Sequence, residues 1–148
     1  MKIKKKKFNP LITIIMNCFN GEKYLKKSIN SILSQSYKNW ELIFWDNKSK
    51  DNSKKIFKIF SDKRLKYYKS KKFTTLYDAR NLAIKKAKGE YISFCDTDDW
   101  WIKSKLKKQV SLIKNNRRIK LIYSNLYLYD QQTKKKNYTS QKRHLVEK

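Results

Sequence analysis

The sequence has little of several residues on which common active sites depend. Its 148 residues include two glycines and one proline, which excludes collagen-like and proline-rich chains and argues against a glycine-rich phosphate-binding loop. The only histidine is His144, so a histidine-based catalytic triad or zinc site is not expected. The two cysteines, Cys18 and Cys95, are too few for a disulfide framework, and each ends an apolar run. Both are therefore expected to be small buried hydrophobic side chains in a reducing compartment.

Long apolar runs are also missing. No stretch approaches the roughly 18 residues that a membrane-spanning helix needs, and the basic start of the chain lacks the apolar core of a signal peptide. These absences predict a soluble, cytoplasmic protein. Apolar residues still make up 39% of the chain, which is enough for one packed domain.

Acidic residues are few beside the basic ones. Lys and Arg number 38 against 12 Asp and Glu, which gives a formal net charge of +26. A charge of this size attracts polyanions such as nucleic acid or anionic lipid. The lysines are spread along the whole chain, however, as expected if an AT-biased genome places lysine at free surface positions. We favour this compositional bias and keep polyanion binding as the alternative.

Short β-branched runs alternate with amphipathic stretches along the chain. Strands are expected near residues 11–16, 40–45, 64–69, 90–95 and 119–129, of which the third is more exposed and the fourth buried. Helices are expected between them, near residues 24–33, 52–60, 75–88 and 102–114. Gly89 is predicted to end the third helix in the C′ position, and residues 130–133 to form a turn into 136–139.

The alternation of strands and helices predicts an α/β fold with a mostly parallel sheet and right-handed crossovers. The predicted domain covers residues 10–140, between a basic flexible arm at 1–9 and an unstructured tail at 141–148.

Polar side chains follow three of the predicted strands. Ligands of parallel α/β sheets bind outside the carboxyl ends of the strands. The residues at these ends are Asn17, Phe19 and Asn20 after the first strand, Asp46 and Asn47 after the second, and Asp96, Asp98 and Asp99 after the fourth. The sequence therefore predicts a binding site where these side chains converge.

The segment Asp96-Thr97-Asp98-Asp99 places three carboxylates in four residues of a strongly basic chain. Carboxylates this close repel one another. Mg²⁺ or Mn²⁺, held by Asp96 and Asp98 in an extended loop together with substrate phosphates, would relieve the repulsion. The alternative is an acidic cap in which Asp99 interacts with the dipole of the next helix. The tryptophans that follow either line a sugar or acceptor pocket or pack that helix against the sheet.

Five segments carry a family resemblance, in a consistent order and spacing. They are ITIIMNCFN (12–20), YLKKSINSILSQSY (24–37), WDNKSKDNS (45–53), ARNLAIKKAKGEYI (79–92) and FCDTDD (94–99). Together they resemble the motifs of the family-two glycosyltransferases, which have the Rossmann-like GT-A fold and a DxD motif. The resemblance implies transfer of a sugar, with inversion and with Mg²⁺ or Mn²⁺, from a nucleotide-diphosphate donor to a glycan or lipid-linked acceptor.

The resemblance also assigns roles at the end of the first two strands. Asn17 and Phe19 hold the positions that contact the nucleobase, often uracil, and Asn20 belongs to the same turn. Asp46 and Asn47 hold the positions of an aspartate pair. An aspartate at position 47 would accept the uracil imide N–H, whereas Asn47 can accept through its amide oxygen or donate instead. A UDP-sugar is the expected donor.

In the acidic loop, the resemblance places Asp98 on the metal that bridges the diphosphate, and Asp96 on the ribose or the metal. Arg80 meets the phosphates or pairs with Asp96. An inverting transfer also needs a carboxylate as general base, and the acidic residues left without another assignment are Asp99, Asp130 and Glu147. The resemblance implies that the base comes instead from an acceptor-binding region well downstream of the DxD motif. The chain is therefore expected to be the donor-binding half of a transferase, with the catalytic base outside it.

Two other functions remain open on the sequence. One is a catalytically inactive module that still binds a nucleotide-sugar. The other is polyanion binding, against which the lack of an RNA-recognition or helix-turn-helix signature argues, so no specific nucleic-acid partner is expected. Within the transferase hypothesis, the lysines can hold the protein at the inner face of an anionic membrane.

Overall fold

The computed structural model describes residues 8–139 and 146–147. The chain divides into two compact units, Met1–Lys107 and Lys108–Lys148, so the predicted domain 10–140 spans both. Most of the predicted arm, and residues 141–145 and 148 of the predicted tail, lie outside the described residues.

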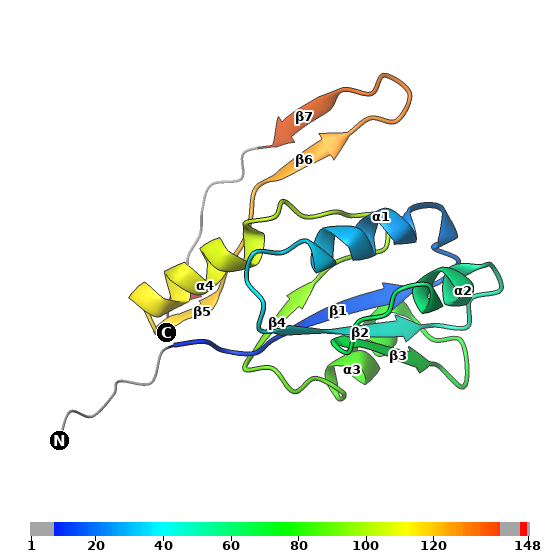
Figure 1. Cartoon of the computed structure of the whole chain (residues 1–148), viewed down its shortest axis with the longest axis horizontal. Coiled ribbons are helices and arrows are strands. Elements are labelled where there is room, and N and C mark those ends of the chain that lie inside the picture. The colour runs from blue at the N-terminus through cyan, green and yellow to red at the C-terminus, as the bar shows by residue number, and fades with distance from the viewer. Residues whose placement is uncertain (1–7, 140–145, 148) are drawn as a thin grey trace. The chain divides into compact units, whose positions relative to one another are not determined.

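The first unit contains a four-stranded parallel sheet with the order β3-β2-β1-β4 (Figure 1). Its strands are β1 (Ile12–Cys18), β2 (Trp40–Asp46), β3 (Leu65–Lys69) and β4 (Tyr91–Phe94). The two central strands are almost wholly buried, as expected for continuous apolar runs inside a parallel sheet. The predicted α/β fold with a parallel sheet is confirmed.

Helices cover both faces of this sheet. In Figure 1, α1 (Glu22–Leu33) and α2 (Ser53–Lys58) lie on one face, and α3 (Leu76–Ile84) lies on the other. This arrangement follows from right-handed crossovers, because the chain reverses direction across the sheet between β3 and β4. On the α3 face, a buried cluster joins helix and sheet: Ile15, Ile43, Trp45, Ala79 and Ala83.

The strand register brings the ends of β1 and β2 level. Cys18 pairs with Asp46, and the Asn47 N–H donates to the Cys18 carbonyl at 2.8 Å. On the other side of β1, the Cys95 N–H donates to the Ile15 carbonyl at 3.0 Å, which fixes the point where the acidic loop leaves the sheet. The polar residues after these strands therefore stand at one edge, as predicted.

The prediction that the fourth strand is buried was wrong. Ile92 is 41% and Phe94 47% exposed, because β4 is an edge strand and the structure describes no strand on its other side. The third strand is the other edge and is partly exposed, as predicted.

Gly89 does not end a helix, so that prediction was also wrong. The helix α3 ends at Ile84, and Gly89 lies against β1 instead. A Cβ at this position would stand 2.5 Å from the Thr13 nitrogen and 2.7 Å from the Leu11 carbonyl oxygen. The missing side chain therefore permits close approach of two backbones, rather than a left-handed turn.

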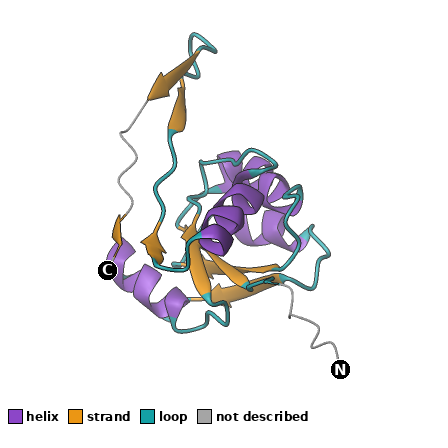
Figure 2. Cartoon of the chain, turned by 90° about the vertical axis from the view of Figure 1, so that its left-hand side faces the viewer, coloured by secondary structure: helices purple, strands orange, loops and turns teal. Residues whose placement is uncertain are grey.

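The second unit holds two small antiparallel sheets. The strand β5 (Ile119–Leu121) pairs with β8 (Val146–Glu147), and β6 (Leu126–Tyr129) forms a hairpin with β7 (Lys136–Thr139) (Figure 2). The predicted single strand at 119–129 is therefore wrong. It is interrupted over residues 122–125, a segment that ends at Asn125, a residue that is rare in strands.

The predicted turn at 130–133 is present. The Asp130 carboxylate accepts hydrogen bonds from the backbone N–H groups of Gln132 and Thr133. The helix α4 (Lys105–Asn115), predicted from residue 102, begins in the first unit and continues into the second. In the part of the chain that the structure describes, no helix is long and apolar enough to cross a bilayer.

Candidate functional site

A pocket of about 230 Å³ opens where β1 and β2 end. Three of the predicted site residues line it, Asn17, Phe19 and Asn47, and the other lining residues are Cys18, Phe73, Thr74, Thr75, Leu76 and Ala79. The second group belongs largely to the loop before α3 and to the first turns of that helix. Sequence analysis gave no role to this loop, because its residues carry no periodic pattern.

Two phenylalanine rings flank the pocket. Phe19 is 50% exposed and Phe73 is 60% exposed, and their ring centroids lie 4.7 Å apart with planes inclined at 56°. Exposed aromatic rings that contact each other across two loops offer an apolar surface on which a flat heterocycle can stack. The available sequence signal for Phe73 was a large apolar residue in the loop between a predicted strand and a predicted helix.

Asn17 brings an unused hydrogen-bond donor to the same pocket. Its side-chain Nδ2 is buried and has no hydrogen-bond partner among the described residues. Leaving a buried amide donor without a partner costs about 1–3 kcal/mol. A ligand with a carbonyl oxygen would remove that cost.

Asn47 is 5% exposed, and its amide group is bonded to the pocket wall. Its Nδ2 donates to the Thr74 carbonyl at 2.8 Å, while its Oδ1 lies 3.2 Å from the Thr74 backbone nitrogen and 3.1 Å from the Thr74 hydroxyl. The end of β2 is thereby tied to the loop before α3.

The acidic segment forms a tight turn, and the predicted extended loop is wrong. The Asp99 N–H donates to the Asp96 carbonyl at 3.1 Å. No helix starts at Asp99, since α4 begins at Lys105, so the alternative of an acidic helix cap is wrong. Burial raises the pKa of the Asp99 carboxyl, and the carboxylates of Asp96 and Asp98 raise it further.

Arg80 and Asp96 form an ion pair at the start of this turn. One guanidinium nitrogen lies 2.9 and 3.3 Å from the two carboxylate oxygens. The pairing of Arg80 with Asp96, one of the two contacts that the sequence suggested for Arg80, is therefore present. The pair gives Asp96 a fixed orientation through a charge-assisted hydrogen bond.

Asp98 is exposed and makes no hydrogen bond or salt bridge with another described residue. Residues 8–139 contain no group of three His, Cys, Asp or Glu side chains able to hold a metal alone. The exposed carboxylate of Asp98 and the half-exposed carboxylate of Asp96 are of the type that suits a Mg²⁺ or Mn²⁺ ion with its other ligands from substrate phosphates and water.

Two serines of α1, the buried Ser28 and the partly exposed Ser31, anchor the acidic turn. The Ser28 hydroxyl lies within hydrogen-bonding distance of the carbonyls of Thr97 and Asp99, and the Trp101 N–H donates to the Ser31 hydroxyl at 3.0 Å. Gly21 also permits this contact, because a Cβ there would stand 3.0 Å from the Thr97 side chain. Ser28 lies on the buried face of α1 together with Leu25, Ile29 and Ile32, and a polar residue among these apolar ones was the available sequence signal for an anchoring role.

Asp46 and Asn20 organise the loops beside the pocket. The Asp46 carboxylate is 1% exposed and accepts from the Ser49 N–H at 2.7 Å and the Tyr67 hydroxyl at 2.5 Å. Burial raises the pKa of Tyr67, and so does the hydrogen bond to Asp46. Asn20 has a φ of 53°, and its Oδ1 accepts from the Lys50 N–H at 2.8 Å.

The structure thus gathers the predicted residues into two groups. Asn17, Phe19 and Asn47 share the pocket, whereas Asp96 and Asp98 belong to the acidic turn, which Arg80 contacts from α3 and which is not among the pocket's lining residues. Asn20 and Asp46 stabilise the loops beside the pocket. The helix α3 joins the groups, because Ala79 lines the pocket and the next residue is Arg80.

Comparison with known proteins agrees with this arrangement. Residues 13–146 match the family described as glycosyl transferase family 2. The chain belongs to this family. Its parallel sheet is therefore that of a family 2 glycosyltransferase domain, as the sequence motifs indicated.

Two of the similar relatives come from Escherichia coli. The chain is 43% identical over 118 residues to UDP-Glc:alpha-D-GlcNAc-diphosphoundecaprenol beta-1,3-glucosyltransferase WfgD, a match that covers 78% of this chain and 45% of WfgD. It is 35% identical over 118 residues to WfaP, which bears the same activity in its name, with 80% of this chain and 47% of WfaP covered. The chain spans less than half the length of these relatives.

Solved structures agree on the GT-A fold. Residues 1–349 of S. aureus TarS superpose with a TM-score of 0.69 at 28% identity, covering 72% of this chain and 33% of that one. The same TarS protein has been solved in complex with UDP-GlcNAc, and that structure superposes with a TM-score of 0.67. The predicted GT-A fold is confirmed for the part of the chain that is covered.

Proposed function

We propose that the chain is the donor-binding half of a glycosyltransferase that uses a UDP-sugar. The main observation behind this proposal is the pocket at the carboxyl ends of β1 and β2, which Asn17, Phe19 and Asn47 line. A pocket with exposed aromatic rings and a buried unpartnered amide suits a flat base with carbonyl oxygens. The UDP-Glc in the names of WfgD and WfaP, and the UDP-GlcNAc bound to TarS, support uridine as the nucleoside.

The diphosphate of the donor lies, in this proposal, against the acidic turn. Asp98 and Asp96 hold Mg²⁺ or Mn²⁺, which neutralises charge on the leaving diphosphate when it is bound. Arg80 orients Asp96 through their ion pair. Asp98 is exposed, so its carboxylate is available to a metal without breaking an existing bond.

The acceptor is a glycan or a lipid-linked sugar, and transfer inverts the anomeric carbon. The diphosphoundecaprenol in the names of two relatives supports a lipid-linked acceptor. The general base lies outside this chain in our proposal. Asp46 is already bonded through both carboxylate oxygens, and Asp96 and Asp98 are assigned to the metal in this proposal, so none of them takes a proton from an acceptor hydroxyl.

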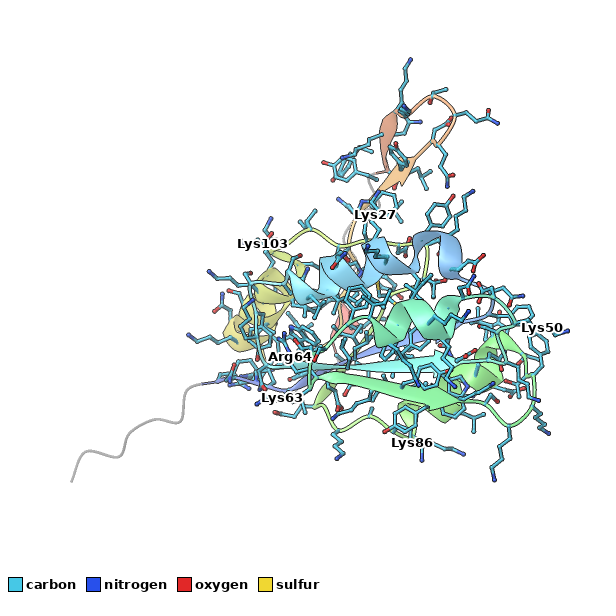
Figure 3. All side chains as sticks on the ribbon, turned by 45° about the vertical axis from the view of Figure 1, so that its right-hand side comes forward. Lys27, Lys50, Lys63, Arg64, Lys86 and Lys103 are labelled. Carbon is cyan, nitrogen blue, oxygen red and sulfur yellow. The ribbon has the colours of Figure 1, made fainter. Side chains whose placement is uncertain are left out.

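We place the reaction in the cytoplasm, at the inner face of the membrane. Lys27, Lys50, Lys63, Lys86 and Lys103 come from different segments and extend from different sides of the first unit (Figure 3). Such a distribution provides a general attraction to anionic lipid rather than one specific polyanion site.

The test is a thermal-shift panel of UDP-, GDP-, CMP- and dTDP-sugars, with and without Mn²⁺. A ligand at about 100 times its dissociation constant stabilises the folded state by about 2.7 kcal/mol. We expect the UDP-sugar with Mn²⁺ to give this stabilisation, Asp98→Asn to lose it, and Glu90→Gln, which changes an exposed carboxylate before β4, to keep it.

Two results would contradict the proposal. Equal stabilisation by GDP- or CMP-sugars would remove the uridine assignment. An Asp98→Asn protein that still binds the UDP-sugar in a Mn²⁺-dependent way would remove the metal assignment. Turnover of the donor, including slow hydrolysis, would separate a transferase from a module that only binds.

A further inference from the structure

The amide of Asn47 and the peptide group of Thr74 form a closed pair. The Asn47 Nδ2 donates to the Thr74 carbonyl at 2.8 Å, and the Thr74 N–H donates back to the Asn47 Oδ1 at 3.2 Å. The Thr74 hydroxyl donates to the same oxygen at 3.1 Å. Asn47 is 5% exposed, so water competes little with these bonds.

This pairing limits what Asn47 can offer to a ligand. An amide oxygen has two lone pairs, and both are directed to Thr74. The amide nitrogen has one hydrogen left after its bond to the Thr74 carbonyl. The imide N–H of a uracil base would therefore find no acceptor on this side chain.

We infer that Asn47 is a positioning residue, which holds the pocket wall at Thr74 and does not read the base. The inference rests on the proposed function, because it concerns the wall of the proposed base pocket. Phe73 and Thr75 flank Thr74 and line the same pocket. Thr75 also caps α3 by accepting the Asp78 N–H at 3.1 Å, so the pair fixes where that helix begins.

Aspartate at position 47 separates the two roles. An ionised carboxylate cannot donate to the Thr74 carbonyl and would place a negative oxygen against it, which weakens the wall. A protonated carboxylic acid has one O–H donor and one carbonyl acceptor, so it can restore the pair with Thr74. If residue 47 instead contacted the base, an ionised aspartate would be a better acceptor than asparagine for the imide N–H.

The two roles therefore predict opposite pH dependence for Asn47→Asp. We expect this variant to bind UDP with Mn²⁺ about tenfold more weakly than wild type near pH 7.5. The deficit should shrink near pH 5.5, because burial and the facing carbonyl raise the pKa of the new carboxyl. Asn30→Asp, which adds the same charge at an exposed position of α1, should follow wild type at both pH values.

Isothermal titration calorimetry measures the affinity for UDP. Backbone hydrogen exchange of residues 72–76, without nucleotide, measures how often the pocket wall opens. We expect faster exchange in Asn47→Asp near pH 7.5, relative to wild type at the same pH, and wild-type exchange near pH 5.5. Binding at wild-type strength or tighter near pH 7.5, or unchanged exchange there, would overturn the inference. A wild type that fails to bind UDP contradicts the proposed function, whereas the exchange data still decide the role of Asn47.

Asn47→Ala covers the case in which Asn47→Asp does not fold. It removes the pair without adding charge, so exchange at residues 72–76 should accelerate by the same factor at both pH values. Weakened UDP binding with wild-type exchange would mean that Asn47 contacts the base directly, which would overturn the inference.

Discussion

Gln35 ties the end of α1 to the segment that follows the acidic turn, and its replacement should be costly. The side chain is fully buried. Its Nε2 donates to the Ile102 carbonyl at 2.8 Å and the Ser31 carbonyl at 3.1 Å, and its Oε1 accepts from the Leu106 N–H at 3.1 Å. The Leu106 N–H belongs to the first turn of α4, where backbone donors have no partner within the helix.

Gln35→Leu keeps a similar volume but removes all of these hydrogen bonds. The Leu106 N–H would be left buried without a partner, since Leu106 is 1% exposed. An unsatisfied buried group costs about 1–3 kcal/mol. The Ile102 carbonyl can gain water more easily, because that residue is exposed, so we expect a total loss of about 2–4 kcal/mol.

Urea denaturation followed by tryptophan fluorescence measures this loss. Gln109→Leu, at a partly exposed position of the same helix, is the matched control and should stay within about 0.5 kcal/mol of wild type. A Gln35→Leu protein as stable as the control would show that these hydrogen bonds do not hold the segment. In the expected case, Mn²⁺-dependent nucleotide binding should also weaken.

Three further substitutions test other contacts. Gly89→Ala should prevent folding or destabilise strongly, because its Cβ would meet the Thr13 nitrogen at 2.5 Å; thermal melting measures this. Tyr67→Phe should cost about 1–3 kcal/mol in urea denaturation, because it leaves a buried oxygen of Asp46 without its donor. The raised pKa of Asp99 means that its ionisation opposes folding, so stability from this group is lost as pH rises through that pKa. Asp99→Asn should therefore be more stable than wild type at neutral pH and equal to it near pH 3.

The central strands and the helix between them could be predicted from the sequence because each carries its own pattern. The run around Ile14 is apolar apart from Thr13 and Asn17 and does not alternate with polar residues, as a strand buried on both faces requires. The stripe formed by Leu25, Ile29 and Ile32 likewise requires a buried helix face. Patterns of this kind describe an element and the side that it buries.

The position of a strand within the sheet could not be predicted in the same way. The apolar run at Ile92 and Phe94 reads like that of a central strand, but β4 is an edge. Burial there depends on which strands pair, and pairing is decided between segments far apart in the chain. The misplaced helix end at Gly89 has the same origin, since the contact that requires glycine is with Thr13.

The part of the candidate site that motif residues form was predicted. The part formed by the loop before α3 was missed. Asn17 and Phe19 reach the pocket as expected. Phe73 and Thr74 reach it because Asn47 holds their loop, and no local pattern signals a hydrogen bond between residues 27 positions apart.

The loops after β1 and β2 are joined by reciprocal bonds, and this has a consequence for the entropy of binding. The Asn52 N–H donates to the Glu22 carboxylate at 2.8 Å, and the Glu22 N–H donates to the Asp51 carboxylate at 2.9 Å. Asn20 adds its bond to the Lys50 N–H. The two loops are thus ordered when the protein folds, so a ligand at their edge does not have to immobilise them. Preorganisation of this kind lowers the entropic cost of association and favours tight binding by a small contact area.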